Sequence, residues 1–98
     1  MSRATIERRL FDLAQRLARS REELAVIDDQ LAALTEAADE ARVRSLVSET
    51  PLAHREYTEA QRHADAMART RANITATIGE MQHAQDELLD RLVADAGS

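Results

Sequence analysis

Residues 6–41 read IERRLFDLAQRLARSREELAVIDDQLAALTEAADEA and decide the fold. Their apolar side chains recur at alternating steps of four and three residues, the heptad spacing by which two helices wind around each other. Ser20 is the one polar residue in this series. We call these positions the seam, and in this half of the chain they are Ile6, Leu10, Leu13, Leu17, Ser20, Leu24, Ile27, Leu31, Leu34, Ala38 and Ala41.

The same spacing resumes after the single proline, Pro51. Thr50 and Pro51 together form a helix-start signal, because a threonine hydroxyl caps free amides and proline lacks an N–H at the first helical position, where none is needed. The sequence therefore predicts a helix over 5–47, a turn over 48–50 and a helix over 51–94. The seam of the second half consists of Ala53, Tyr57, Ala60, Ala64, Met67, Arg71, Ile74, Ile78, Met81, Gln85, Leu88 and Leu92.

The charge distribution indicates how the two helices are oriented. Residues 3–21 carry six arginines against two acids, whereas residues 80–95 carry five acids against Arg91. Antiparallel folding brings these stretches together, while a parallel dimer would place like charges side by side. Each exposed pair contributes only a few tenths of a kcal/mol, so the pattern selects an orientation more than it stabilises one. The predicted fold is all-α, an antiparallel two-helix coiled-coil hairpin that forms a single domain over residues 1–98.

The composition narrows the classes of partner. The net charge is -5 and aromatic residues make up 2% of the chain, which argues against direct nucleic-acid binding by phosphate attraction or base stacking. The absence of cysteine excludes disulfides and thiolate metal sites. Without a signal peptide or a long apolar run, we expect a cytoplasmic protein that does not bind membranes.

Two acid–histidine spacings deserve comparison with metal sites. Glu80 and His83 have the Glu-x-x-His spacing of di-iron carboxylate bundles, and Glu59 and His63 lie one helical turn apart. Glu80 and His83 fall on positions that face away from the seam, and no second pair completes a ligand shell around Glu59 and His63. We therefore expect no metal ligands, no cofactor, no catalytic residues and no enzymatic activity.

Polar residues at seam positions are expected to specify register, because they cost stability and suppress slipped pairings. Ser20 and Arg71 are the clearest cases. The long side chain of Arg71 can also extend to the rim of the helix pair, where Asp28 and Asp29 offer carboxylates.

A second apolar series runs along the first helix outside the seam. Ala4, Phe11, Ala18, Ala25 and Ala32 recur every seven residues, with Ala14, Val26 and Ala33 beside them. Alanine is a good helix former, so this series has a purely local explanation. The alternative is a packing surface for a second copy, which would give a homodimer with four helices. We call the residues expected at that interface the alanine stripe: Phe11, Ala14, Ala18, Ala25 and Ala32.

The predicted turn carries aliphatic residues that the seam does not use, and we call them the tip cluster: Val43, Leu46, Val47 and Leu52. Two interpretations stay open. They fold over one another as a cap, or they present an apolar patch to a protein partner. Charged neighbours, among them Glu49, give the patch a polar rim, as at a protein interface. The residues expected to bind a partner are Val43, Leu46, Val47, Glu49 and Leu52.

The stretch from Glu40-Ala41-Arg42 through Ser48-Glu49-Thr50 to Glu56-Tyr57 and Ala60 resembles the tip of the N-terminal coiled-coil hairpin of Gre-type transcript cleavage factors. The resemblance covers about twenty residues and implies a hairpin that enters a channel of RNA polymerase, where acidic tip residues hold magnesium. Glu49 matches one acidic residue, whereas Leu46 stands at the position of its companion aspartate. A single carboxylate does not supply the paired ligation that such a metal needs, so cleavage activity is not implied.

These observations favour a non-enzymatic protein-protein interaction module, or adaptor, that binds its partner through the turn. The alternative is a transcription-associated hairpin that binds RNA polymerase or a sigma factor without cleaving RNA.

Overall fold

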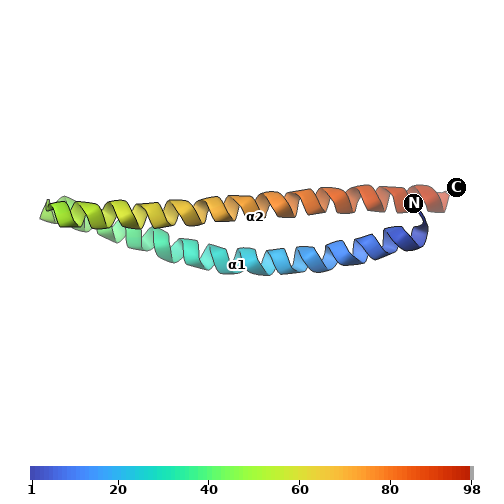
Figure 1. Cartoon of the computed structure of the whole chain (residues 1–98), viewed down its shortest axis with the longest axis horizontal. Helices are drawn as coiled ribbons and strands as arrows, with labels where there is room; N and C mark the ends of the chain where they lie inside the picture. The colour runs from blue at the N-terminus through green and yellow to red at the C-terminus, as the bar shows by residue number, and fades with distance from the viewer. Residues whose placement is uncertain (98) are drawn as a thin grey trace. The chain divides into compact units, whose positions relative to one another are not determined.

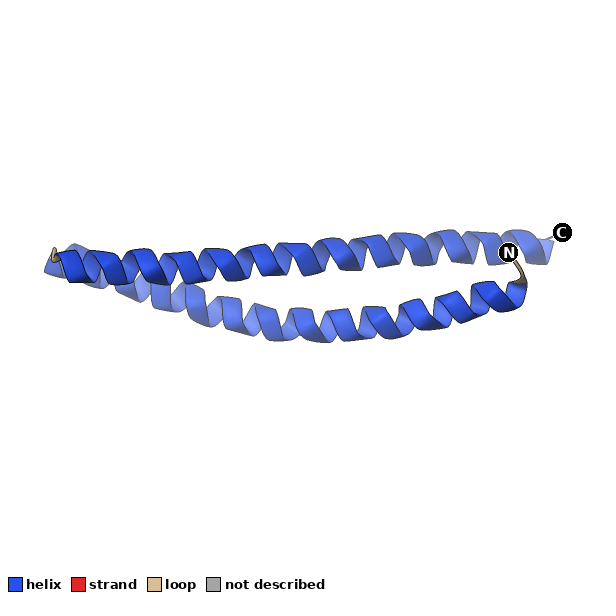
Figure 2. Cartoon of the chain, viewed as in Figure 1, coloured by secondary structure: helices blue, strands red, loops and turns tan. Residues whose placement is uncertain are grey.

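The computed structural model describes residues 1–97 and contains two α-helices in that range (Figure 1). α1 spans Arg3–Ser48 and α2 spans Pro51–Gly97. The described residues include no β-strand (Figure 2), so the all-helical class predicted from the heptad spacing is confirmed. The predicted helical ranges, 5–47 and 51–94, fall inside the observed bounds.

α1 begins two residues before its predicted start because Ser2 caps it. The Thr5 N–H donates to Ser2 Oγ at 3.2 Å, and the Ile6 N–H donates to the Ser2 carbonyl oxygen at 3.0 Å. The first bond satisfies an amide that has no carbonyl partner within the first turn of a helix, and the second is the first backbone bond of α1. The Ser2 and Thr5 hydroxyls also lie 2.9 Å apart.

α1 ends at a residue in the left-handed conformation. Glu49 has a φ of 51°, and its N–H donates to the Ser45 carbonyl oxygen at 3.1 Å. This arrangement closes the last turn of a helix and is usually made by glycine, which has no Cβ to clash with the neighbouring carbonyl. The chain thus reverses at Glu49 and Thr50 alone, between the end of α1 and the start of α2.

α2 begins with the predicted cap. The Ala53 N–H donates to Thr50 Oγ1 at 3.1 Å, and the His54 N–H donates to the Thr50 carbonyl oxygen at 3.1 Å. Pro51 occupies the first helical position. The capping role predicted for Thr50 is therefore confirmed.

The chain divides into two compact units, each made of a segment of α1 and a segment of α2. We call residues 1–23 with 74–97 the terminal unit, and residues 24–73 the turn unit. The core of the terminal unit is built from large side chains: Ile6, Leu17, Ile78, Met81 and Leu88. The turn unit buries small ones instead: Ala38, Ala41, Ala53 and Ala64.

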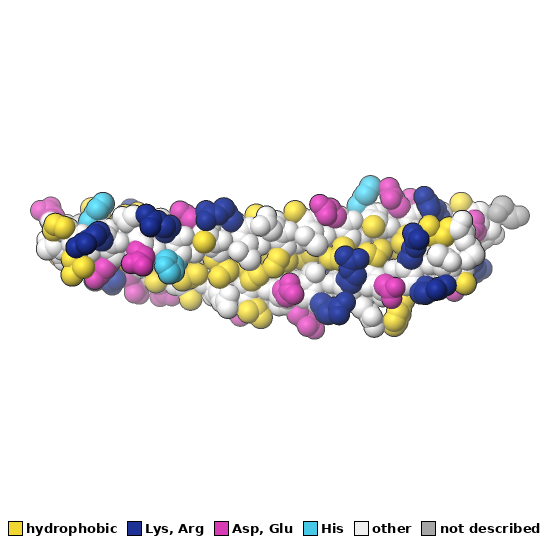
Figure 3. All heavy atoms as spheres, viewed as in Figure 1, with side chains coloured by type: hydrophobic (Ala, Val, Ile, Leu, Met, Phe, Trp, Pro, Cys, Tyr) yellow, Lys and Arg dark blue, Asp and Glu magenta, His cyan; other side chains and the backbone are white. Residues whose placement is uncertain are grey.

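The core follows the predicted seam without exception. Each seam position of both helices is buried or half-buried, including the polar residues Ser20, Arg71 and Gln85. On the face drawn in Figure 3, hydrophobic side chains are visible between charged ones. Neither helix, over its described length, combines the apolarity and the length that crossing a lipid bilayer requires.

Candidate functional site

The tip cluster lies at the end of α1 and the first turn of α2, and all four of its side chains face solvent. Val43 is 55% exposed, Leu46 67%, Val47 80% and Leu52 59%. These fractions show that the four side chains do not bury one another as a cap. Exposure of single aliphatic residues is ordinary, but four within ten residues of sequence form a local apolar surface.

The seam explains why these side chains are left outside the core. Its spacing continues four residues past Ala41 to Ser45, which is half-buried and donates its hydroxyl to the Arg42 carbonyl oxygen at 2.8 Å. A helix has one face toward its partner, so the aliphatic residues on either side of Ser45 point elsewhere. Val43, Leu46 and Val47 are therefore exposed by the same geometry that buries Ala41.

Glu49 sits between the two parts of the tip cluster and is itself exposed. Its positive φ is uncommon for a residue with a long side chain, and such residues occur where function or surrounding structure retains them. The carboxylate stands at the reversal of the chain. Leu46, three residues before Glu49, is apolar and exposed.

The alanine stripe is exposed along α1. Phe11 is 64% exposed, and Ala14, Ala18, Ala25 and Ala32 are exposed as well. In the terminal unit, α2 adds two further exposed aliphatic residues, Leu89 and Val93.

Arg71 pairs with the first of its two candidate carboxylates. Its Nε donates to Asp28 Oδ1, which links α2 to α1 inside the turn unit, and both side chains remain nearly half-exposed. Asp28 follows the seam residue Ile27 directly and is half-buried, whereas Asp29 is exposed. One residue along a helix is a rotation of about 100°, so Asp29 is turned further away from the partner helix.

The histidines with acidic neighbours, His63 and His83, each contact a glutamate on the surface of α2. Glu59 Oε1 lies 3.9 Å from His63 Nε2, and Glu87 Oε1 lies 3.2 Å from His83 Nε2. His83 thus contacts Glu87 rather than Glu80. Residues 1–97 contain no cluster of three acidic or histidine side chains placed to hold a metal ion.

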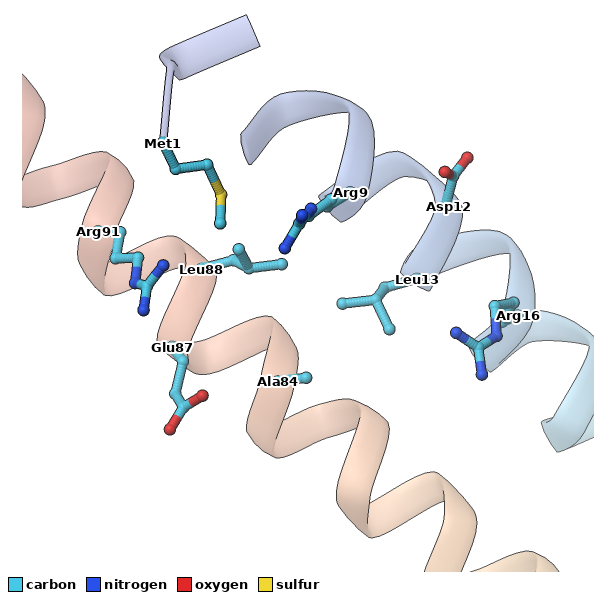
Figure 4. A pocket seen from close by; sticks show the side chains of 9 residues that line it. All are labelled: Met1, Arg9, Asp12, Leu13, Arg16, Ala84, Glu87, Leu88 and Arg91. Carbon is cyan, nitrogen blue, oxygen red and sulfur yellow. The ribbon is translucent and has the colours of Figure 1, made fainter. Parts of the chain in front are cut away.

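The structure also contains a hollow that the sequence did not predict. In the terminal unit, about 400 Å³ of space lies between α1 and α2, above an apolar floor and beside three arginines (Figure 4). We call it the arginine groove. Heptad spacing predicts which helix face a residue lies on, but not how deep the space between two helices is. The one sequence feature that could have indicated this groove is the arginine-rich composition of residues 3–21. Its floor is Leu13, Ala84 and Leu88, and its arginines are Arg9, Arg16 and Arg91.

The sequence matches no protein-family model, and comparison with curated proteins and with solved structures likewise finds no match.

Proposed function

We propose that this protein is a non-enzymatic interaction module that binds a protein partner through its turn. The exposed tip cluster carries the proposal. It combines three aliphatic side chains from α1 with Leu52 from α2, each more than half exposed, at a place where the chain reverses within two residues.

The energetics of such a contact are favourable. Complete burial of a valine or leucine side chain contributes about 1.5–3 kcal/mol, so four together offset a substantial part of the cost of association. Charged residues around the cluster, among them Glu49 and Arg55, provide a rim that sets orientation. A tight reversal also presents the cluster with little conformational freedom left to lose on binding.

A tagged pull-down with a paired variant tests the proposal. Leu46→Glu with Val47→Glu places two charges in the apolar patch and is expected to abolish capture of the partner while helix content is unchanged. Both side chains are solvent-exposed, so the core is not disturbed. Gln30→Glu with Ala37→Glu is the matched control, because it adds the same charge at exposed positions of α1 outside the tip cluster and the alanine stripe. Partner capture retained by the tip variant, or lost equally in both, would exclude the tip as the binding site.

We further propose that two copies associate through the alanine stripe as a homodimer. The exposed Phe11 supports this, since a large aromatic side chain gains more from burial than any other residue of the stripe. Leu89 and Val93 add two exposed aliphatic side chains to the terminal unit, which also contains Phe11.

A second candidate function is a hairpin that binds RNA polymerase or a sigma factor without cleaving RNA. The exposed carboxylate of Glu49 at the reversal favours it, because this residue matches an acidic tip position of the transcript cleavage factors. Co-purification of polymerase subunits with the wild-type chain, lost on Glu49→Gln, would support it. Their absence from the captured proteins would leave the general interaction module as the function.

A further inference from the structure

We infer that the arginine groove of the terminal unit binds an acidic amphipathic helix of a protein partner. In this arrangement, carboxylates of the partner helix meet Arg9 and Arg16, and an apolar residue between them rests on Leu13 and Leu88. This surface is separate from the tip cluster, so the inference does not depend on the function proposed for the turn.

The groove has an apolar floor that the helix pair leaves partly accessible. Leu13 and Ala84 are half-buried, Leu88 is 9% exposed, and all three line the hollow of about 400 Å³. The Met1 side chain lies near Leu88 at one end of the hollow (Figure 4). Space of this size beside apolar side chains accommodates an inserted leucine or a residue of similar size.

The arginines of the groove have no carboxylate partners among residues 1–97. None of the ion pairs found in this range involves Arg9, Arg16 or Arg91. In Figure 4 the side chains of Arg9 and Arg16 extend from α1 toward α2. Three guanidinium groups beside one apolar floor favour an anionic occupant, since guanidinium forms paired hydrogen bonds with carboxylates.

The two acidic residues at the groove do not neutralise these arginines. The Glu87 carboxylate lies 3.2 Å from His83 Nε2 on the same helix, and in Figure 4 the Asp12 carboxylate points away from the hollow. The local charge facing the groove is therefore positive although the whole chain carries -5. Charge complementarity selects an acidic partner at this site.

The spacing of the arginines favours a helix over a small anion. Arg9 and Arg16 are seven residues apart on α1, which separates their backbone positions by about 10 Å, so the single head group of a small amphiphile is not expected to engage both. Carboxylates seven residues apart on another helix repeat this distance. A residue midway between them then faces Leu13, which lies between the two arginines in the sequence.

The probe is a blocked helical peptide of about fifteen residues with two glutamates seven residues apart and a leucine midway, long enough to hold a helix when its other positions are alanine-rich. Its control peptide carries glutamine in place of both glutamates. Binding is followed by backbone-amide NMR of the full-length protein. The expected result is saturable shifts at Arg9, Leu13 and Leu88, which the glutamine peptide does not produce.

Paired variants locate the contact. Arg9→Gln with Arg16→Gln is expected to weaken peptide binding about tenfold, from the loss of two partly exposed ion pairs. Arg8→Gln with Arg19→Gln makes the same change in net charge on other faces of α1, and is expected to leave binding unchanged. Arg9→Glu with Arg16→Glu should bind a peptide whose glutamates are replaced by arginine. Binding regained in this way cannot result from unfolding, so the test stays decisive even when the glutamine variants lose helix content.

Several outcomes would overturn the inference: no saturable shifts, equal weakening by both glutamine pairs, or equal binding of the glutamine peptide. Sodium laurate serves as a small anionic amphiphile in a parallel titration. Shifts at the groove with laurate and none with the peptide would identify the ligand as a small amphiphile, contrary to the inference.

Discussion

Glu49 is the residue at which local conformation and candidate function meet. A left-handed backbone at a residue with a Cβ costs about 1–2 kcal/mol, and glycine avoids that cost. The chain nevertheless has glutamate there, with φ at 51°. The two-residue reversal holds this conformation in place, because the Glu49 N–H closes α1 and Thr50 opens α2. The backbone of Glu49 is thereby fixed at the turn, and its side chain faces solvent.

Glu49→Gly is expected to stabilise the protein. The free energy of unfolding should rise by about 0.5–1 kcal/mol, because removal of the Cβ relieves the left-handed strain by more than glycine adds to the freedom of the unfolded chain. Urea unfolding followed by circular dichroism measures the change. Glu36→Gly is the control, and as an exposed position inside α1 it should lower stability by about 1 kcal/mol. Equal destabilisation by both substitutions would contradict a strained turn.

The same variant separates strain from recognition. When Glu49 contacts the partner proposed for the tip, Glu49→Gly should weaken partner capture although it stabilises the fold. If the variant gains stability and still captures the partner fully, Glu49 does not contact the partner. The binding surface then consists of the tip cluster alone.

At the scale of the elements, hydroxyl caps determine where the two helices begin. Ser2 and Thr50 each accept a backbone N–H three residues ahead, at 3.2 and 3.1 Å. Each also provides the first carbonyl acceptor of its helix. The starts of α1 and α2 are therefore specified locally, and the seam specifies which residues of each helix are buried.

Thr50→Ala is expected to lower the free energy of unfolding by about 1 kcal/mol, because the Ala53 amide loses its acceptor. Thr58→Ala is a matched control. The Thr58 hydroxyl donates to the His54 carbonyl oxygen within α2, at 3.0 Å, and such a bond adds little to a helix. Thermal unfolding of the two variants compares them. A loss for Thr58→Ala as large as that for Thr50→Ala would show that the cap has no special role.

The ion pair between Arg71 and Asp28 links the helices but is expected to contribute little energy. Both side chains are more than two-fifths exposed, so water and salt screen the attraction. A double-mutant cycle with Asp28→Ala and Arg71→Ala should give a coupling energy below about 1 kcal/mol, and molar salt should abolish it. A coupling of several kcal/mol that resists salt would show instead that this pair stabilises the turn unit directly.

The elements also show how far sequence reasoning reaches. Every predicted seam position is buried or half-buried, because burial in a helix pair follows a strict period. Ser45, four residues beyond Ala41 on the same period, is also half-buried and was missed. Ser2 was missed as a cap because the first seam residue, Ile6, set the estimated start of α1. The left-handed Glu49 was missed because no glycine marks it. The arginine groove was missed because its depth depends on the separation of α1 and α2, which periodicity does not determine.

For the molecule as a whole, the main expectation is self-association. Ala18→Arg with Ala25→Arg places two charges on the alanine stripe and should convert a dimer to a monomer in analytical ultracentrifugation. A melting temperature lower by roughly 5 °C should accompany it, since association stabilises the folded state. Gln30→Arg with Ala37→Arg adds the same charge at exposed positions, seven residues apart, on a different face of α1, and should leave the mass unchanged. A wild-type mass that equals that of the stripe variant would end the dimer proposal.

The division into two units has a consequence for folding. Contacts in the turn unit close short loops around Glu49 and Thr50, so they cost little chain entropy, but they bury mainly alanine. Contacts in the terminal unit bury leucine, isoleucine and methionine, but the segments that make them are separated in sequence by all of residues 24–73. The easily formed contacts are therefore the weak ones.

Folding should accordingly proceed in one cooperative step, with neither unit stable alone. Tyr57, the single tyrosine, lies in the turn unit and reports on it by fluorescence, whereas circular dichroism reports on both helices. The two signals should change at the same urea concentration. Should the tyrosine signal change first, the turn unit would unfold independently. A coincident transition would mean that residues at the two ends of the chain set how firmly a turn at its middle is held.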